Sequence, residues 1–243
     1  MRYFMKLKRV VQKLDRTTDS FILAVCMILL FIGIYSMLDN LWVYNNAVDK
    51  SIFDYKPDLN DVLTDDKKIT EKQIAWIELP DTGIDYPIFQ GEDNMEYLNK
   101  NPYGEFSLSG SIFLDSRNDH LFKDPYSIVY GHHMENLIMF GALDQYLDPE
   151  FAKTHKTGTL ITEENVFQFN AFSVISAEAT NDVLFNPGYL ERDKIVAYLK
   201  EYSTYYEEPV NDGQLLALST CAGENDLARL LLIGTLSEIE IKS

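Results

Sequence analysis

One uncharged apolar run near the N-terminus constrains this chain of 243 residues more than any other feature. The run extends from Phe21 to Leu38, lies between Asp19 and Asp39, and follows a basic segment. Its eighteen residues, at about 1.5 Å per residue, would form a helix about 27 Å long. That length matches a hydrocarbon core of about 30 Å, so the run predicts one membrane-spanning helix.

A cleaved signal peptide is the competing interpretation, because a basic start and an apolar core are typical of both. This run is longer than a usual signal core, and no small-x-small cleavage site follows it. We therefore expect an uncleaved anchor at 21–38. Since basic residues stay on the cytoplasmic side, residues 1–20 are expected in the cytoplasm and the chain after the anchor outside the cell membrane.

The outer part of the chain is strongly acidic. The whole sequence has 21 Lys and Arg residues against 38 Asp and Glu residues, for a formal net charge of −17. Contacts with phosphates need clustered basic side chains, and no such cluster occurs after residue 16. The composition therefore argues against nucleic acid and anionic lipid as partners of this part.

Residues 70–243 read as one domain of short apolar segments separated by turn residues. Turn signals at 80–83 and 163–165 are expected to close two hairpins. Eight short strands in a segment of this length indicate a sandwich or a barrel. They are expected at 74–79, 84–89, 111–114, 127–130, 159–162, 166–175, 215–219 and 230–236.

Three helical segments are also expected. Residues 39–69 are polar, with apolar residues near a helical period, and predict a helical stalk between the membrane and the domain. A second helix is expected near 137–147 and a third over 190–206. Five residues of the third helix form one stripe, which we interpret as a packing face: Ile195, Tyr198, Leu199, Tyr202 and Tyr206.

The outer domain has a single cysteine, Cys221, because Cys26 lies in the apolar run. It therefore has no internal disulfide, and a lone thiol outside the cell is open to oxidation. Cys221 follows one expected strand, and Arg229 opens the next after a polar loop. If the two strands pair, a guanidinium beside the thiol would favour the thiolate and could stabilise an oxyanion. A buried core cysteine and a strand-end surface charge are the alternatives.

A histidine pair, His132 and His133, follows an apolar strand and Gly131. A histidine in this position can exchange protons near neutral pH, although each histidine alone is more typical of a polar loop residue. The sequence contains four histidines but no H-E-x-x-H pattern and no paired cysteine spacing. We therefore expect no metal site. Acyl transfer by a cysteine nucleophile, a histidine and an arginine requires no organic cofactor either.

Two short motifs connect these residues to a known family. A Tyr-Gly-His sequence at 130–132 and a Leu-Ser-Thr-Cys sequence at 218–221, with Arg229 downstream, resemble the sortases, cysteine transpeptidases of Gram-positive cell surfaces. The resemblance to class B covers about residues 70–236. It implies a mainly β fold, a closed eight-stranded sortase-type β-barrel with an N-terminal helical stalk and an extra helix before the last strands. The segments that carry it are 75–77, 84–88, 94–98, 110–115, 130–134, 139–140 and 190–206.

The resemblance also assigns roles. Cys221 matches the nucleophile, His132 the general acid and base, and Arg229 the transition-state partner. His132 is chosen over His133 because the family's catalytic histidine directly follows the glycine. Four further positions match residues that line the peptide groove in class B relatives: Asn94, Leu98, Tyr130 and Ser219.

The implied reaction is acyl transfer through a thioester. The enzyme would cleave a C-terminal sorting motif of secreted proteins after a threonine and join them to an amine of a peptidoglycan precursor or cross-bridge. One alternative is a pilin-polymerising sortase with a lysine acceptor, which the absence of an Asp-Pro-Trp-like lid in the sequence disfavours. The other is a non-catalytic module that binds surface proteins, in which Cys221, His132 and Arg229 would all be structural.

Overall fold

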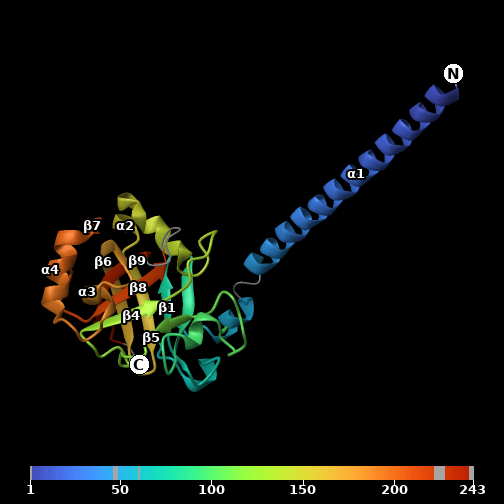
Figure 1. Ribbon diagram of the computed structural model, residues 1–243. Coiled ribbons are helices and arrows are strands. Elements are labelled where there is room, and N and C mark those ends of the chain that lie inside the picture. Colours follow the sequence, from blue (N-terminus) through green and yellow to red (C-terminus); the bar gives the residue numbers. More distant parts are fainter. Residues whose placement is uncertain (1, 46–48, 60, 222–227, 241–243) are drawn as a thin grey trace. The chain divides into compact units, whose positions relative to one another are not determined.

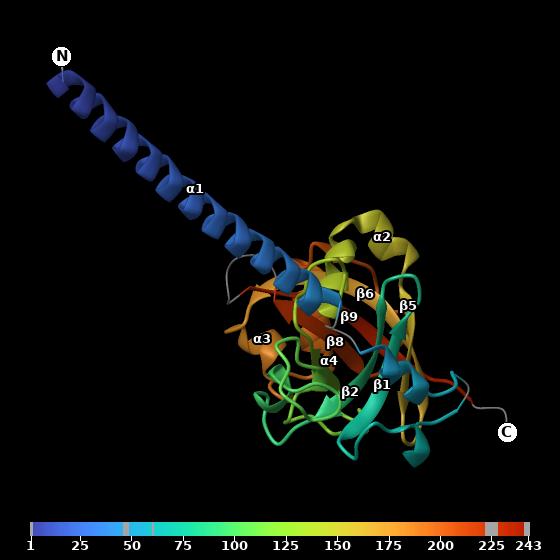
Figure 2. The ribbon, with the colours of Figure 1, turned by 90° about the vertical axis from the view of Figure 1, so that its right-hand side faces the viewer.

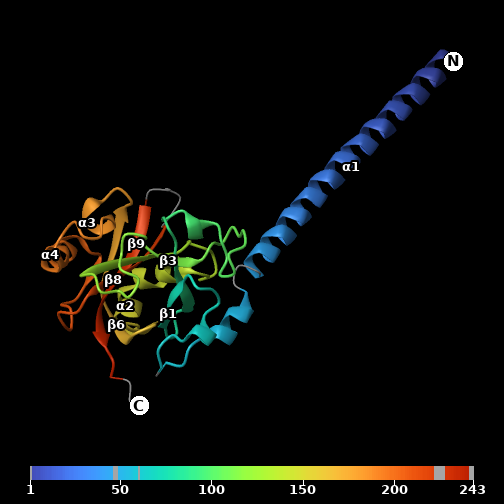
Figure 3. The ribbon, with the colours of Figure 1, turned by 90° about the horizontal axis from the view of Figure 1, so that it is seen from below.

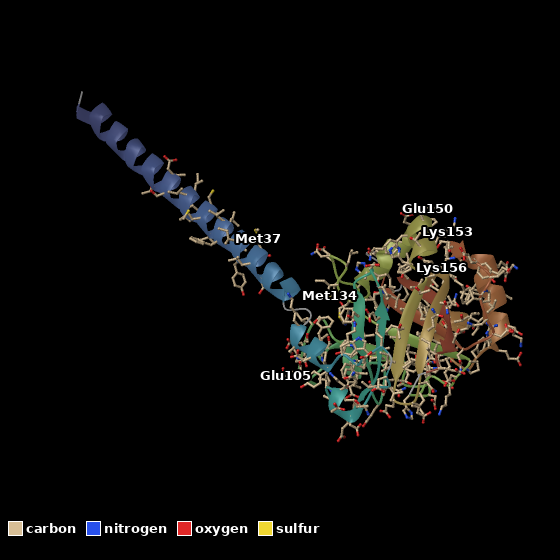
Figure 4. The ribbon with its side chains drawn as sticks, turned by 180° about the vertical axis from the view of Figure 1, so that it is seen from behind. Met37, Glu105, Met134, Glu150, Lys153 and Lys156 are labelled. Carbon is tan, nitrogen blue, oxygen red and sulfur yellow. The ribbon has the colours of Figure 1, made fainter. Side chains whose placement is uncertain are left out.

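The computed structural model describes residues 2–45, 49–59, 61–221 and 228–240, and the chain divides into two compact units between residues 47 and 48. The first unit is one long helix, α1 (Arg2–Asn45). It contains an apolar span of 23 residues, Thr17–Asp39, whose side chains, Met37 among them, are exposed and point away from the helix axis (Figure 4). By length and composition this helix can cross a membrane.

The described part of the second unit forms a closed barrel of eight strands (Figure 1). The strands follow the order β5-β1-β2-β3-β4-β8-β9-β6, and β6 pairs with β5 to close the barrel. Each strand overlaps one expected from the sequence, which confirms the fold prediction. Their bounds are β1 Gln73–Leu79, β2 Ile84–Gln90, β3 Ile112–Leu114, β4 Tyr126–Tyr130, β5 Thr157–Thr162, β6 Val166–Glu178, β8 Leu215–Cys221 and β9 Ala228–Glu238.

Two tight turns set the register of neighbouring strands, and both were expected. Between β1 and β2, Asp81 and Gly83 have positive φ angles of 62° and 88°. Gly adopts this left-handed conformation without strain and Asp tolerates it. Between β5 and β6, the Thr162 N–H donates to the Asn165 carbonyl at 2.9 Å. β1 also pairs with β5, so that β2, β1 and β5 run next to one another in the barrel (Figure 2).

Two large apolar cores and one small cluster, formed by Phe89, Tyr97 and Phe113, hold the described part of the unit together. The first fills the barrel and includes the fully buried Trp76 and Phe140. The second lies where α3 (Asp182–Phe185) and α4 (Arg192–Tyr202) cover one side of the barrel (Figure 3). There Ile195 and Leu199 pack among residues of β6, β8 and β9, and burial of each such side chain contributes roughly 1.5–3 kcal/mol.

The helix expected over 190–206 is shorter in the structure. It ends at Tyr202, and the next residues form the short strand β7 (Tyr205–Tyr206), which pairs with β6. The pairing of β7 satisfies backbone N–H and C=O groups of β6 beyond the end of β5. A longer helix would leave these groups unpaired. Tyr206 therefore leaves the predicted stripe, and Tyr202 is 55% exposed, whereas Ile195 and Leu199 are buried as expected.

Two further helical segments follow the histidine pair. The helix expected near 137–147 is the 3-10 helix η4 (Phe140–Leu147). The structure adds α2 (Pro149–Thr154), which was not expected. Its start is specified by Asp148, whose carboxylate accepts from the Glu150 N–H at 3.0 Å. Glu150 and Lys153 project from its outer side (Figure 4).

The segment before β1 packs against the barrel. Two 3-10 helices, η1 (Lys50–Tyr55) and η2 (Asp65–Lys67), stand where a continuous helical stalk was expected. Ile52 and Leu63 are 2% and 3% exposed and belong to the barrel core. The Leu63 N–H also donates to a carbonyl of β5 at 2.8 Å. From residue 49 onward the described chain is therefore part of the barrel unit, while residues 39–45 of the expected stalk belong to α1.

Candidate active site

Two strand ends that are distant in the sequence meet at one edge of the barrel. β4 and β8 are parallel neighbours, with Tyr130 opposite Ser219. The Gly131 N–H continues this pairing, because it donates to the Ser219 carbonyl at 3.1 Å. His132 therefore leaves the sheet beside the end of β8. Gly131 leaves little room for a side chain, since an added Cβ would lie 2.5 Å from Cδ1 of Ile112 and 2.7 Å from the ring Cγ of the buried Phe140.

The neighbouring strand brings the arginine to the same edge. β9 runs antiparallel to β8, and Cys221 lies opposite Arg229. The expectation that these two strands pair is confirmed. Arg229 is partly buried, and one of its NH groups donates to the Ala228 carbonyl at 3.0 Å. The backbone of Cys221 is described, while its side chain and residues 222–227 lie outside the described part of the chain.

A cavity of about 270 Å³ opens at these strand ends. It contains His132, Arg229 and all four residues expected to line a peptide groove. Cys221, the remaining predicted site residue, has its backbone at the end of β8, opposite Arg229. The cavity is lined by Asn94, Leu98, Phe113, Tyr130, Gly131, His132, Ala179, Phe185, Ser219, Thr220 and Arg229.

The ring of His132 is held by a neutral partner. Its Nε2 lies 2.7 Å from the carbonyl oxygen of Leu98. A carbonyl only accepts, so Nε2 carries a hydrogen and Nδ1 is left to exchange a proton. The Cδ2 atom, next to Nε2, faces Gly110, where an added Cβ would lie 3.0 Å away. Nδ1 is therefore on the ring edge turned away from the Leu98–Gly110 segment.

His133 is held in a different way. Its Nε2 lies 2.7 Å from an oxygen of the Asp144 carboxylate on η4. Its backbone forms an isolated bridge with Met139. These contacts tie the turn between the two residues to η4. His133 is absent from the cavity lining, so its side chain contacts η4 rather than the cavity.

A buried carboxylate that sequence reasoning missed lies behind the cavity. Asp115 directly follows β3, and its side chain is fully buried. One of its oxygens accepts from the Nδ2 of Asn94 and the hydroxyl of Tyr130, each at 3.0 Å. Arg117 donates through Nε at 2.9 Å and through a terminal NH at 2.7 Å. The only signal in the sequence is a charged residue directly after an apolar strand.

The charges around this carboxylate decide its protonation. Burial alone would raise the pKa of Asp115, but the hydrogen bonds and the positive charge of Arg117 hold it below its ordinary value. Burial and the neighbouring carboxylate both raise the pKa of Tyr130. At neutral pH, Asp115 is thus ionised and Tyr130 keeps its proton.

One buried hydroxyl in the cavity lining has no hydrogen-bond partner in the part of the chain that the structure describes. Ser219 is 1% exposed, and among the described residues its Oγ has no hydrogen-bond partner. Leaving such a buried group unpaired costs about 1–3 kcal/mol. The described residues contain no group of three or more His, Cys, Asp or Glu side chains that could hold a metal ion.

Two relatives of this chain among known proteins are both sortase B enzymes. The chain is 33% identical to sortase B of Listeria monocytogenes over 187 residues, which cover 74% of this chain and 75% of the relative. It is 36% identical to sortase B of Staphylococcus aureus over 107 residues, 44% of each chain. No family model matches.

Solved structures extend this likeness to the fold. A Streptococcus pyogenes class B sortase involved in pilus biogenesis superposes with a TM-score of 0.65 at 37% identity, covering 70% of this chain and 94% of that one. Clostridium perfringens sortase B superposes with a TM-score of 0.64 at 29% identity, covering 70% and 96%. The barrel and these relatives define a cysteine transpeptidase. The chain belongs to the class B sortases.

Proposed function

We propose that this sortase uses Cys221 as nucleophile, His132 as general acid and base, and Arg229 to stabilise the oxyanion. The observation that carries this proposal is the cavity in which His132 and Arg229 line one space beside the backbone of Cys221. A thiol, a group that exchanges protons near neutral pH and a fixed positive charge are what acyl transfer requires.

In the first half-reaction, the thiolate of Cys221 attacks the carbonyl carbon of a threonine in a sorting motif near the C-terminus of a secreted protein. Arg229 donates hydrogen bonds to the oxyanion of the tetrahedral intermediate. His132 gives the proton on Nδ1 to the departing amine. The carbon–nitrogen bond breaks and leaves a thioester on Cys221.

In the second half-reaction, an amine of a peptidoglycan precursor or cross-bridge attacks the thioester. His132 takes the proton of this amine on Nδ1, the new amide bond forms and the thiolate of Cys221 leaves. Substrate and amine partners are supported by solved relatives, which include a Staphylococcus aureus sortase B–substrate complex and a sortase B complexed with triglycine.

The peptide groove and the anchor complete the proposal. Asn94, Leu98, Tyr130 and Ser219 bind the sorting motif, since all four line the cavity next to His132. The apolar span of α1 anchors the enzyme in the cell membrane, with residues 1–20 in the cytoplasm and the catalytic barrel outside. The span alone supports the anchor, and the basic residues before it support the orientation.

A pilin-joining activity is a second candidate, and one observation favours it. The Streptococcus pyogenes relative at 37% identity is a class B sortase involved in pilus biogenesis. In that case the amine of the second half-reaction belongs to a lysine side chain of another protein. The chemistry at Cys221, His132 and Arg229 is the same in both cases, so only the acceptor distinguishes them.

The test uses the full chain in detergent micelles, with Cys221→Ala as the matched control. Each protein is incubated with candidate sorting peptides and with glycine, diamino-acid or lysine-bearing nucleophiles, and mass spectrometry identifies the products. We expect cleavage after threonine, an adduct on Cys221 and the loss of both in the control. Transfer to the lysine peptide alone would favour pilin joining. A folded protein with a reactive thiol and no adduct would contradict the proposal and favour a binding module.

A further inference from the structure

We propose that Asp115 is a positioning residue for the substrate groove, and that its carboxylate decides which polar atoms Asn94 and Tyr130 present to the peptide. This inference rests on the groove proposed above. It goes beyond that proposal because it assigns a hydrogen-bonding direction to each of the two groove residues.

The buried carboxylate of Asp115 is stabilised by a small set of hydrogen-bond donors. Its side chain is fully buried, and a buried charge is destabilising by several kcal/mol unless it is paired and hydrogen-bonded. Its side-chain donors are Asn94, Tyr130 and Arg117. Two of these three line the cavity. The carboxylate is thus the common point to which the groove side chains are attached.

The orientation of Asn94 follows from its two contacts. Its Oδ1 accepts from the Ser116 N–H at 2.7 Å, and its Nδ2 donates one hydrogen to Asp115. The reversed amide would place its oxygen against the carboxylate and its nitrogen against an N–H group, which is repulsive at both ends. The amide nitrogen has a second hydrogen. Asn94 therefore offers a donor to the groove, suited to a peptide carbonyl.

The direction of the Tyr130 hydroxyl is fixed by the same carboxylate. An ionised carboxylate only accepts, so the hydroxyl hydrogen points to Asp115. The ring is also packed against Phe113, with centroids 5.5 Å apart. The Tyr130 oxygen can then only accept, both from the Arg117 side chain beside it and from a peptide N–H in the groove. Asn94 and Tyr130 together offer the donor and acceptor that the carbonyl and N–H of an extended peptide need.

Arg117 connects the carboxylate to a third part of the cavity lining. One of its terminal NH groups donates to the Phe185 carbonyl at 2.8 Å, and the other contacts the Asn186 side chain at 3.3 Å. Phe185 ends α3 and lines the cavity. Asp115 thus connects three segments: the segment after β2 through Asn94, the end of β4 through Tyr130 and the end of α3 through Arg117.

The test is Asp115→Asn in the full chain, in a Cys26→Ser background so that Cys221 is the single thiol. This change keeps the size of the side chain and removes its charge. The new amide can donate as well as accept, so the Asn94 amide and the Tyr130 hydroxyl can each reverse the direction of their hydrogen bond. We expect KM for the sorting peptide to rise about tenfold, with kcat within about threefold, since two directed hydrogen bonds to substrate are weakened. The rate of Cys221 alkylation by iodoacetamide should stay unchanged.

Asp124→Asn is the matched control. Asp124 also accepts from an asparagine side chain, the Nδ2 of Asn118 at 2.8 Å, but it does not line the cavity. We expect KM to stay at the wild-type value in this variant. An equal rise of KM in both variants would show that charge loss acts through general stability and would overturn the inference.

A double-mutant cycle separates positioning from independent binding. Tyr130→Phe alone should raise KM about fivefold, and in the Asp115→Asn background it should add less than about twofold, because Asp115 acts through Tyr130. Fully multiplicative effects would overturn the inference. If Asp115→Asn fails to fold, Arg117→Gln, at a side chain that is 48% exposed, should still raise KM, and an unchanged KM would again overturn it.

The wild-type enzyme in the same assay keeps the two proposals apart. A wild type that cleaves no peptide contradicts the proposed function itself. Cleavage by the wild type, with the same KM in Asp115→Asn, contradicts only the positioning role of Asp115.

Discussion

The cavity has two walls that the chain builds by different means. The sheet wall consists of cavity residues at the ends of β4, β8 and β9, including His132, Ser219 and Arg229, and backbone pairing fixes their positions. The loop wall consists of Asn94 and Leu98 in the segment 91–111, where η3 (Glu96–Leu98) is the helical turn and side chains such as Asp115 supply the support. The proposed catalytic residues are thus on rigid backbone, while peptide contacts on the loop wall can be altered by single side chains.

The largest expected effect separates two adjacent histidines at the sheet wall. His132→Gln should lower kcat/KM by about 10²- to 10⁴-fold, because the proton transfer at Nδ1 is lost. His133→Gln should lower it by less than about tenfold, since His133 contacts Asp144 rather than the cavity. Steady-state kinetics with a sorting peptide measures both variants. Similar losses in the two variants would contradict the assignment of His132.

A smaller effect is expected where the loop wall supports His132. Gly110 has a φ of 58°, and an added Cβ would lie 2.5 Å from the Leu98 carbonyl oxygen, which holds the His132 ring. Gly110→Ala should therefore displace this carbonyl and lower kcat/KM by more than about tenfold. It should also lower the free energy of unfolding by about 3 kcal/mol.

Gly104→Ala is the control for backbone strain alone. Gly104 has a φ of 84°, but an added Cβ meets nothing within 4 Å. We expect this variant to lose about 1 kcal/mol of unfolding free energy and to keep the wild-type kcat/KM. Loss of activity in Gly104→Ala comparable to that in Gly110→Ala would show that strain, rather than displacement of the Leu98 carbonyl, controls the site.

Two serines compare the cavity side of the sheet with its interior. Ser127 on β4 and Ser219 on β8 are each 1% exposed, and neither hydroxyl has a partner among the described residues. Each Ser→Ala change should stabilise the protein by up to about 1 kcal/mol. Ser219→Ala alone should raise KM, by about two- to fivefold, because Ser219 lines the cavity and Ser127 does not. An unchanged KM in Ser219→Ala would remove Ser219 from the groove.

The sheet wall was largely predictable from the sequence. Apolar segments and turn residues such as Asp81 and Gly83 located all eight barrel strands, because these signals are local. The parallel pairing of Tyr130 with Ser219 joins strands far apart in the chain and was not predicted, although the family resemblance had placed both residues in one groove. The end of the last helix was placed too late, because the pairing of β7 with β6 is a tertiary contact that competes with the helical pattern.

The loop wall was predictable only in part. Asn94 and Leu98 were assigned through the resemblance, whereas the support behind them was missed. Asp115, Arg117 and Tyr130 have no periodic spacing, and a carboxylate after a strand is indistinguishable from an ordinary loop residue in the sequence. A network of side chains from three segments becomes visible only when the fold brings them together.

The smallest expected effect is a loss of stability at low pH, where protonation of Glu96 weakens the contacts of the loop wall. The Glu96 carboxylate accepts from Lys72 at 2.9 Å, from the Glu92 N–H at 3.0 Å and from Lys100 at 3.2 Å. Lys72 is the main cause that lowers the pKa of Glu96 to about 2, and burial opposes it. Because the folded pKa lies below the unfolded value of about 4.3, ionised Glu96 stabilises the folded state above that value.

This stabilisation is lost as the pH falls from about 4.3 through about 2. The melting temperature of the wild type should therefore fall more steeply between pH 5 and pH 2 than that of Glu96→Gln, whose side chain does not titrate. Glu105→Gln, on the same segment and in contact with Asn101 at 3.3 Å, is the control and should follow the wild-type slope (Figure 4). Equal slopes for Glu96→Gln and the wild type would show that ionised Glu96 does not stabilise the loop wall.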